Sequence, residues 1–374
     1  MNPSSTSLFD PWRIGPHALS HRVVMPPLTR MRAGLADGVP SPFAPTYYAQ
    51  RASEGGFLIG EATQISKQGQ GYPGTPGIYS SAQVDAWRKV TRAAKAKGAV
   101  IFLQLWHVGR ISHSSHQPDG KPPVAPSAMR PQGKAFDAAW NRVPYETPRA
   151  LAIKEIAAIV ADYRSAAANA HDAGFDGVEL HGANGYLLDQ FLEDSTNLRQ
   201  DRYGGAIENR TRLLLEAIDA VSEVWGADRV GVRLSPFGTV GDIADSDPQR
   251  LFEQVIKALA QRGIAYLHLI EPRANAGIRD DLNLAAPPSV AALFRHAFNG
   301  PLIASGGFDR ISALAAVESG IADAVAFGRA FIANPDLPQR LAMNAPLNTY
   351  DQRTVYGGAA RGYTDYSAWK QNAA

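Results

Sequence analysis

Residues 176–186 read Asp-Gly-Val-Glu-Leu-His-Gly-Ala-Asn-Gly-Tyr, a short apolar run that ends in polar side chains. Its first part, 177–181, is typical of a buried strand, so His181, Asn184 and Tyr186 come where the strand becomes a loop. His181 and Asn184 can each donate a hydrogen bond, and Tyr186 carries a proton that is rarely lost near neutral pH. Two donors that converge on one oxygen polarise a carbonyl group, and a third group can supply a proton. This set suits the reduction of a conjugated carbonyl compound.

Further apolar runs of the same kind occur along the chain. They lie at residues 22–28, 57–65, 99–106, 229–234, 266–270, 302–305 and 324–328. Several segments between them have the apolar spacing of amphipathic helices, as at 153–160 and 213–225, and Gly174 and Gly226 stand where those helices would end. Strands that alternate with helices predict a parallel sheet, and closing eight such units gives a (β/α)8 TIM barrel.

The chain has 374 residues, well above the roughly 250 of an ordinary barrel of this type. No linker or internal repeat divides it, so we expect a single domain over 1–374 that carries an insertion. The best candidate is 107–149, which is rich in proline and has little periodicity. It follows the third strand and is expected to cover the catalytic face as a lid or subdomain. A plain surface insertion is the alternative.

Composition excludes several classes of function. The net charge is only +2 and no long basic run occurs, so nucleic acid and anionic membranes are not expected as partners. The chain has no cysteine, which rules out disulfides, thiolate metal sites and a cysteine nucleophile, and we expect no metal. No apolar run is long enough for a membrane span, and residues 1–10 lack the pattern of a signal peptide. We therefore expect a cytoplasmic monomer or homodimer.

The chemistry of such a barrel gathers at the carboxyl ends of its strands. Those ends carry Pro27 and Thr29, Glu61 and Ala62, Gln104 and Trp106, Glu179 and His181, Arg233, Glu271, Ser305 with Gly306 and Gly307, and Gly328 with Arg329. The last two groups follow the seventh and eighth strands, where barrels commonly bind a phosphate. Glycines let backbone N–H groups approach the phosphate oxygens, and an arginine adds charge-assisted bonds. Tight turns are the alternative reading of these glycines.

Other chemistries are less well supported. The segment 69–74 (Gly-Gln-Gly-Tyr-Pro-Gly) matches a dinucleotide-binding fingerprint, but Pro73 and Pro76 oppose the helix that such a fingerprint must open, so we expect a loop. Glu179 and Glu271 could form a glycosidase pair, although a structural role in holding arginine or backbone N–H groups is favoured. No nucleophile elbow, phosphate-binding Walker loop or zinc-protease helix motif occurs.

Longer motifs make the chain resemble the Old Yellow Enzyme family. Besides 181–190 they are 202–210 (Arg-Tyr-Gly-Gly-Ala-Ile-Glu-Asn-Arg), 233–238 (Arg-Leu-Ser-Pro-Phe-Gly), 268–273 (His-Leu-Ile-Glu-Pro-Arg), 327–336 (Phe-Gly-Arg-Ala-Phe-Ile-Ala-Asn-Pro-Asp) and 362–366 (Gly-Tyr-Thr-Asp-Tyr). The resemblance runs from about Pro11 to Tyr366. It implies an FMN-dependent ene-reductase that takes hydride from NADPH or NADH and reduces the activated C=C bond of α,β-unsaturated carbonyl compounds, with nitro compounds, nitrate esters, maleimides and quinones as further acceptors.

The resemblance also implies residue roles. The flavin ring would contact Pro27, Thr29, Ala62, Gln104 and Arg233, and the FMN phosphate would contact Ser305, Gly306, Gly307, Gly328 and Arg329. His181 and Asn184 would bind the substrate oxygen, Tyr186 would protonate the α-carbon, and Trp106 and Tyr356 would border the substrate.

Three positions depart from the pattern of the family. Pro26 stands where relatives often have alanine, and Val240 and Val355 stand where many have phenylalanine. If these positions line the pocket, it is roomier than usual. Another flavin-dependent barrel oxidase or dehydrogenase, and a flavin protein without turnover, remain alternatives.

Overall fold

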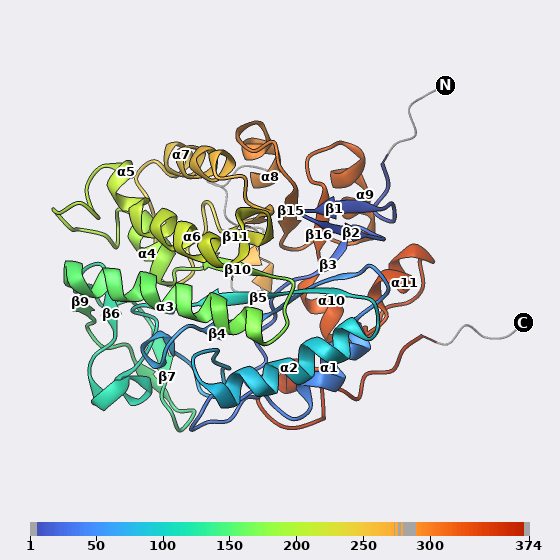
Figure 1. The fold of residues 1–374 in the computed structure, drawn as a ribbon, viewed down its shortest axis with the longest axis horizontal. Coiled ribbons are helices and arrows are strands. Elements are labelled where there is room, and N and C mark those ends of the chain that lie inside the picture. The colour runs from blue at the N-terminus through green and yellow to red at the C-terminus, as the bar shows by residue number, and fades with distance from the viewer. Residues whose placement is uncertain (1–5, 273, 276–277, 280–288, 370–374) are drawn as a thin grey trace, which may run out of the picture.

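Eight parallel strands close into a barrel at the centre of the molecule (Figure 1). The computed structural model describes residues 6–272, 274–275, 278–279 and 289–369. Around the barrel the strands are β10 (Gly177–Gly182), β11 (Val230–Leu234), β12 (Tyr266–Ile270), β15 (Leu302–Ser305), β16 (Ala324–Ala326), β3 (Val23–Met25), β4 (Phe57–Gln64) and β5 (Val100–Trp106). The predicted (β/α)8 architecture is therefore confirmed.

The first and last barrel strands are shorter than the sequence predicts. The predicted strand 22–28 is reduced to Val23–Met25, because Pro26 and Pro27 have no N–H group with which to continue the ladder. The predicted strand 324–328 is reduced to Ala324–Ala326, because Gly328 already opens a helix. As a result, Pro27 and Thr29 lie on irregular backbone, whereas Gly328 and Arg329 lie in the first turn of a helix.

Helices surround the barrel. They are α1 (Ala44–Arg51), α2 (Ser81–Lys95), α3 (Ile153–Asp172), α4 (Leu187–Leu192), α5 (Ile207–Arg210), α6 (Arg212–Trp225), α7 (Pro248–Gln261), α8 (Val290–Phe294), α9 (Arg310–Glu318), α10 (Gly328–Ala333) and α11 (Leu337–Ala342). Gly174 and Gly226 follow α3 and α6 with φ of +81° and +78°, as the predicted helix ends require. In the described part of the chain, no helix is both long and apolar enough to cross a membrane.

A hairpin that the sequence reading missed lies before the barrel. Strands β1 (Trp12–Ile14) and β2 (His17–Leu19) pair antiparallel. Trp12, Ile14 and Leu19 join one buried cluster with side chains from several barrel strands, including Phe102 and Tyr266. The hairpin therefore completes the apolar core of the barrel, and polar chemistry is left to the opposite end of the strands.

The expected insertion 107–149 contains short strands of its own. Strand β6 (Val124–Ala125) pairs parallel with β9 (Arg149–Ala150), and β7 (Lys134–Phe136) pairs antiparallel with β8 (Arg142–Pro144). In Figure 1 these strands lie on the side of the molecule opposite the β1–β2 hairpin. The Arg110 guanidinium ties the insertion to the loop after β11 by donating to the carbonyl oxygens of Gly241 at 2.9 Å and Asp242 at 2.5 Å.

Buried arginines fix the C-terminal segment to the barrel. Arg30 donates to the carbonyl oxygens of Val355 at 3.0 Å and Gly362 at 2.6 Å. Arg51 donates to those of Phe331 at 2.8 Å and Ile332 at 2.7 Å, and it is only 1% exposed. Each guanidinium satisfies carbonyl oxygens that have no strand or helix partner, so these contacts replace regular secondary structure.

Tyrosine rings complete this anchor. Tyr47 and Tyr363 stack with their ring centroids 4.1 Å apart, and the Arg51 guanidinium lies 3.8 Å from the centroid of Tyr47. A desolvated cation over an aromatic face contributes about 2 kcal/mol, beyond the hydrogen bonds.

We predict that Arg51→Met destabilises the fold strongly. The substitution leaves buried carbonyl oxygens without a donor, which costs about 3 kcal/mol and lowers the melting temperature by roughly 5 °C. Arg353→Ala is the control, because Arg353 pairs only with its neighbour Asp351 and its side chain is 84% exposed. Thermal unfolding followed by circular dichroism measures both variants. Equal melting temperatures for Arg51→Met and the parent chain would contradict the anchoring role.

Candidate active site

His181, Asn184 and Tyr186 emerge from the carboxyl end of β10 on a tightly held loop. Asn184 adopts a left-handed conformation with φ of +58°, which asparagine tolerates better than most residues. Gly185 follows with φ of +73°, and a Cβ there would lie 2.1 Å from the carbonyl oxygen of Val240. These two positions reverse the chain, so His181, Asn184 and Tyr186 lie within six residues around a compact turn.

A buried carboxyl group holds this turn in place. Asp189 accepts the N–H of Gly185 at 2.9 Å and the hydroxyl of Ser235 at 3.3 Å. Ser235 in turn accepts the N–H of Asn184 at 2.8 Å. Burial raises the pKa of Asp189 to about 7, while these hydrogen bonds act in the opposite direction. The loop after β11 therefore positions the loop after β10.

Aromatic rings gather around the three side chains. The Trp106 ring lies edge-on to Tyr186 at 4.9 Å and stacks with His181 at 6.2 Å, while His181 and Tyr186 are 5.0 Å apart. Tyr72 stacks on Trp106 at 5.7 Å, and its hydroxyl lies 3.2 Å from that of Tyr186. Trp106 is thus the centre of the cluster and fixes the direction of the Tyr186 ring.

The electrostatic environment keeps His181 neutral and Tyr186 protonated. Burial, with the nearby Arg233 and His268, holds the pKa of His181 well below its usual value. Burial also raises the pKa of Tyr186 well above its usual value, although the hydrogen bond with Tyr72 opposes this shift. A neutral imidazole still carries one N–H donor, and a protonated phenol is a competent acid.

A layer of polar side chains crosses the barrel beneath this cluster. Gln104 Nε2 donates to Glu179 Oε1 at 2.7 Å, and His268 Nδ1 lies 2.9 Å from Glu179 Oε2. Strand register sets Arg233 beside both His181 and His268. The Glu179 carboxyl group also opposes the lowering of the Arg233 pKa that burial causes. Gln104, His268 and Arg233 therefore all interact with Glu179, the first two through close polar contacts and Arg233 through its charge.

Several buried polar atoms at this end have no partner. Within the described residues, these include Trp106 Nε1, His181 Nδ1, Arg233 Nε and His268 Nε2. Buried polar groups are almost always hydrogen-bonded in folded proteins. Several buried polar atoms without a hydrogen-bond partner at one end of the barrel therefore indicate a site for a large polar ligand.

The glycine-rich strand ends lie across the barrel from His181. Ser305 closes β15 and donates its hydroxyl to the Leu269 carbonyl at 3.1 Å. Gly306 and Gly307 follow with φ of +107° and +75°, and neighbouring β16 leads to Gly328 and Arg329 at the start of α10. Consecutive glycines with positive φ leave room for an anion to approach the backbone, so this edge, a glycine cradle, suits a phosphate.

The other predicted contact residues also lie at this end. Pro27 and Thr29 follow β3, with Pro27 buried and Thr29 partly buried, and Ala62 is buried in neighbouring β4 beside Trp106. The pairing of β4 with β5 shifts register between Gly60 and Thr63, which marks a bulge at Ala62. Bulges redirect side chains next to active sites. Tyr356 comes from the C-terminal segment and stands at the rim, where it is 57% exposed.

The structure does not support a glycosidase pair. Glu179 is occupied by Gln104 and His268. Glu271 accepts the Ser289 hydroxyl at 3.0 Å and the N–H of Val290 at 2.8 Å, which caps the start of α8. The last residue of the motif 268–273, Arg273, lies outside the described residues.

Tyr72 is the main residue that the sequence reading missed. It lies in the glycine segment 69–74, which is a loop as predicted. A Cβ on Gly71 would lie 2.2 Å from the Ile111 carbonyl oxygen, and Gly74 has φ of +67°, so the glycines serve close packing. Tyr72 could have been found from its position in the sequence, because an aromatic residue soon after a barrel strand lies at the catalytic end of the barrel.

Comparisons with known proteins agree with this geometry. Residues 7–348 match the NADH:flavin oxidoreductase / NADH oxidase family. The chain is 48% identical to 12-oxophytodienoate reductase 1 of Oryza sativa subsp. japonica over 96% of this chain and 92% of the relative. It is 46% identical to morphinone reductase in complex with tetrahydroNAD, with a TM-score of 0.92 over 99% of each chain. An old yellow enzyme homologue from Zymomonas mobilis is 44% identical, with a TM-score of 0.92 over 97% of this chain and all of the other.

The fold, the polar barrel end and the family match all lead to one assignment. The chain belongs to the NADH:flavin oxidoreductase / NADH oxidase family, the Old Yellow Enzyme family of FMN-dependent enzymes that use a nicotinamide coenzyme to reduce activated carbon–carbon double bonds.

Proposed function

We propose that this enzyme reduces α,β-unsaturated carbonyl compounds, with His181 and Asn184 as donors to the carbonyl oxygen and Tyr186 as the proton donor. The observation that carries the proposal is the contact between a neutral, buried His181 and a protonated Tyr186, both packed on Trp106. A reaction that adds hydride to carbon and a proton to its neighbour needs both kinds of group on one substrate.

The residues at the barrel end fit FMN. The open polar atoms of Arg233 and His181 suit a flat ring with polar edges, and the glycine cradle across the barrel suits a phosphate. Pro27, Thr29, Ala62, Gln104 and Arg233 would hold the ring, and Ser305, Gly306, Gly307, Gly328 and Arg329 would hold the phosphate. When bound, FMN supplies the hydride that it receives from NADPH or NADH.

His181 and Asn184 stabilise the charge that develops on the substrate oxygen. As hydride reaches the β-carbon, electron density moves through the conjugated system to the carbonyl oxygen. A fixed donor aimed at such an oxygen contributes about 3 kcal/mol to lowering the barrier. A neutral His181 donates without being a permanent cation, while Arg233 beside it supplies the fixed positive charge.

Tyr186 delivers the proton to the α-carbon. Its hydroxyl oxygen lies 3.2 Å from that of Tyr72 and its ring packs edge-on to Trp106, so the position of the hydroxyl group is fixed. The hydride and this proton together saturate the double bond. The neighbouring hydroxyl of Tyr72 would then return a proton to Tyr186. Tyr356 borders the substrate at the rim of the barrel end.

We predict that Arg329→Ala weakens FMN retention. Arg329 is exposed beside the glycine cradle, and a charge-assisted hydrogen bond to phosphate contributes about 1.5–3 kcal/mol, or roughly 10- to 100-fold in the FMN dissociation constant. Free FMN is measured by fluorescence after ultrafiltration, with Arg353→Ala as the control. Release of FAD in place of FMN, or an unchanged constant in Arg329→Ala, would count against the cradle.

The donors to the substrate oxygen can be tested with phenol, whose oxygen mimics that of the substrate. The double variant His181→Ala/Asn184→Ala should bind phenol at least roughly tenfold more weakly, as read from the flavin absorbance. Because the pKa of His181 lies well below its usual value, His181 stays neutral and itself contributes no break near pH 6.5 to the rate of enone reduction. Unchanged phenol affinity, or a His181-dependent break near that pH, would refute this assignment.

Tyr186→Phe should separate the two half-reactions. Transfer of hydride from NADPH to the enzyme needs no proton from Tyr186 and should keep its rate. Reoxidation by 2-cyclohexenone should slow by roughly 10²- to 10⁴-fold, the usual effect of losing a general acid. Tyr163→Phe is the matched control, since its buried hydroxyl has no partner among the described residues. Stopped-flow absorbance measures both steps, and equal slowing of both would show that Tyr186 is not the proton donor.

A further inference from the structure

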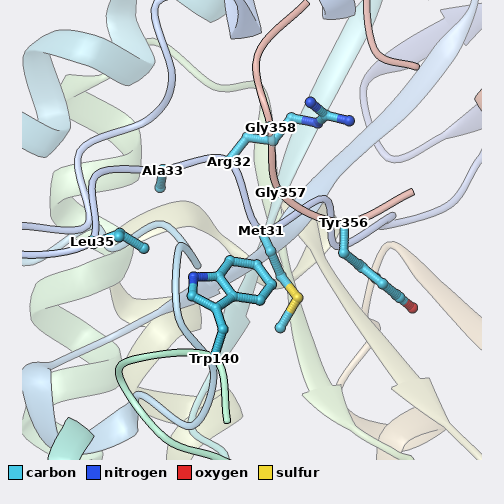
Figure 2. Close-up of a pocket in the computed structure, with 8 residues that line it drawn as sticks. All are labelled: Met31, Arg32, Ala33, Leu35, Trp140, Tyr356, Gly357 and Gly358. Carbon is cyan, nitrogen blue, oxygen red and sulfur yellow. The ribbon is translucent and has the colours of Figure 1, made fainter. Parts of the chain in front are cut away.

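A cavity of about 450 Å³ lies at the rim of the catalytic end, and of its lining residues Tyr356 alone has been given a role toward the substrate (Figure 2). Three segments build it: the loop after β3 with Met31, Ala33 and Leu35, the tip of the insertion with Trp140, and the C-terminal segment with Tyr356. The first two segments follow carboxyl ends of barrel strands, and Arg30 fixes the third to the barrel. The cavity therefore opens on the side where substrates enter.

Tyr356 joins this cavity to the catalytic cluster. It lines the cavity, and its neighbours in the chain are held by Arg30 in the loop after β3: Arg30 Nε donates to the Val355 carbonyl at 3.0 Å, and the Gly357 N–H donates to the Arg30 carbonyl at 2.9 Å. Tyr356 also contributes to raising the pKa of Tyr72 and of Tyr186. In the function proposed above Tyr356 borders the substrate, so this cavity extends the substrate site outward.

The walls of the cavity include the flat rings of Trp140 and Tyr356 and the apolar side chains of Met31, Ala33 and Leu35. Figure 2 shows the Trp140 indole between Leu35 on one side and Met31 with Tyr356 on the other. Leu35 and Tyr356 are 59% and 57% exposed, so both side chains are accessible to a ligand at this open site. Arg32 also lines the cavity, but its terminal nitrogens donate to the carbonyl oxygens of Thr354 and Ala359.

Packing contacts hold Trp140 in an unusual backbone conformation. Its backbone has φ of +67°, a conformation that bulky residues rarely adopt. Phe136 packs edge-on against the indole at 6.2 Å, and a Cβ on Gly357 would lie 3.2 Å from Trp140 Cη2. Backbone strain of this kind persists where surrounding contacts enforce it, often at ligand sites. The insertion thereby presents an aromatic wall to the cavity.

We propose that this cavity is the outer part of the substrate site and binds a flat apolar ring system carried by the substrate at a distance from its activated double bond. The proposal rests on the function proposed above and adds the substrate class: conjugated carbonyl compounds with a bulky aromatic or fused-ring substituent. Aromatic rings stack with Trp140 and Tyr356, and neighbouring Met31 and Leu35 suit their edges.

N-substituted maleimides test the proposal because one reacting centre carries different substituents. The chain has no cysteine, so these reagents do not alkylate thiols of the enzyme. Ala33→Phe fills the cavity, and Trp140→Ala removes a wall. Each variant should lower kcat/KM for N-(2-naphthyl)maleimide by roughly tenfold or more, mainly through KM, since burying an aromatic ring stabilises the complex by at least that factor. For N-ethylmaleimide, kcat/KM and KM of each variant should stay within about twofold of the values of the parent enzyme.

The outcomes separate the two proposals. Failure of the parent enzyme to reduce N-ethylmaleimide would overturn the proposed function itself. Reduction of both maleimides with no selective loss in Ala33→Phe would overturn the outer site alone, and this variant does not depend on the fold of the insertion. A matching loss in the rate of reduction by NADPH would also overturn it, because the cavity would then serve the adenosine part of the coenzyme. Leu347→Ala, an exposed apolar residue outside the cavity lining, is the control.

Discussion

Closure of an eight-stranded parallel barrel is the constraint on which the rest of the structure depends. Because the β1–β2 hairpin and Phe102 fill one end of the barrel with apolar groups, polar inward side chains gather at the carboxyl ends of the strands. Glu179 makes that polar end possible, because its two oxygens engage Gln104 and His268 and its charge faces Arg233. Without this carboxyl group, a buried guanidinium would lack a counter-charge, which is costly in the interior of a protein.

The loop that carries the proposed reacting groups, His181, Asn184 and Tyr186, depends on the same closure. Asn184 and Gly185 occupy left-handed conformations, which a free loop would not keep. They are kept because β10 and β11 are neighbours, so that Ser235 and Asp189 can capture the backbone of the turn. Pairing of adjacent strands thus converts a sequence of three polar residues into a set with fixed directions, and preorganised donors are more effective than mobile ones.

The sequence was sufficient for features that repeat locally. Apolar runs predict all eight barrel strands, and the rule that function follows strand ends brings His181, Gln104 and Arg233 together. It was not sufficient where partners are far apart in the chain. The bonds of Arg30 to Val355 and Gly362 join positions more than three hundred residues apart, and carbonyl acceptors leave no trace in side-chain patterns. Tyr72 was not predicted from the sequence for another reason: its glycine-rich surroundings resemble a nucleotide-binding motif, which drew attention away from the tyrosine itself.

Different interactions fix the catalytic cluster and the rim at which substrates enter. The catalytic cluster is fixed by strand register and by buried groups such as Glu179 and Trp106, where any change disturbs the barrel. The rim is fixed mainly by arginines that donate to backbone carbonyls, as Arg30, Arg32 and Arg110 do. Such bonds are indifferent to the side chains of the segments they hold. Side chains at Leu35, Trp140 and Tyr356 are therefore free to differ without loss of the anchoring, so the fold lets the shape of the entrance vary while the reacting groups stay constant.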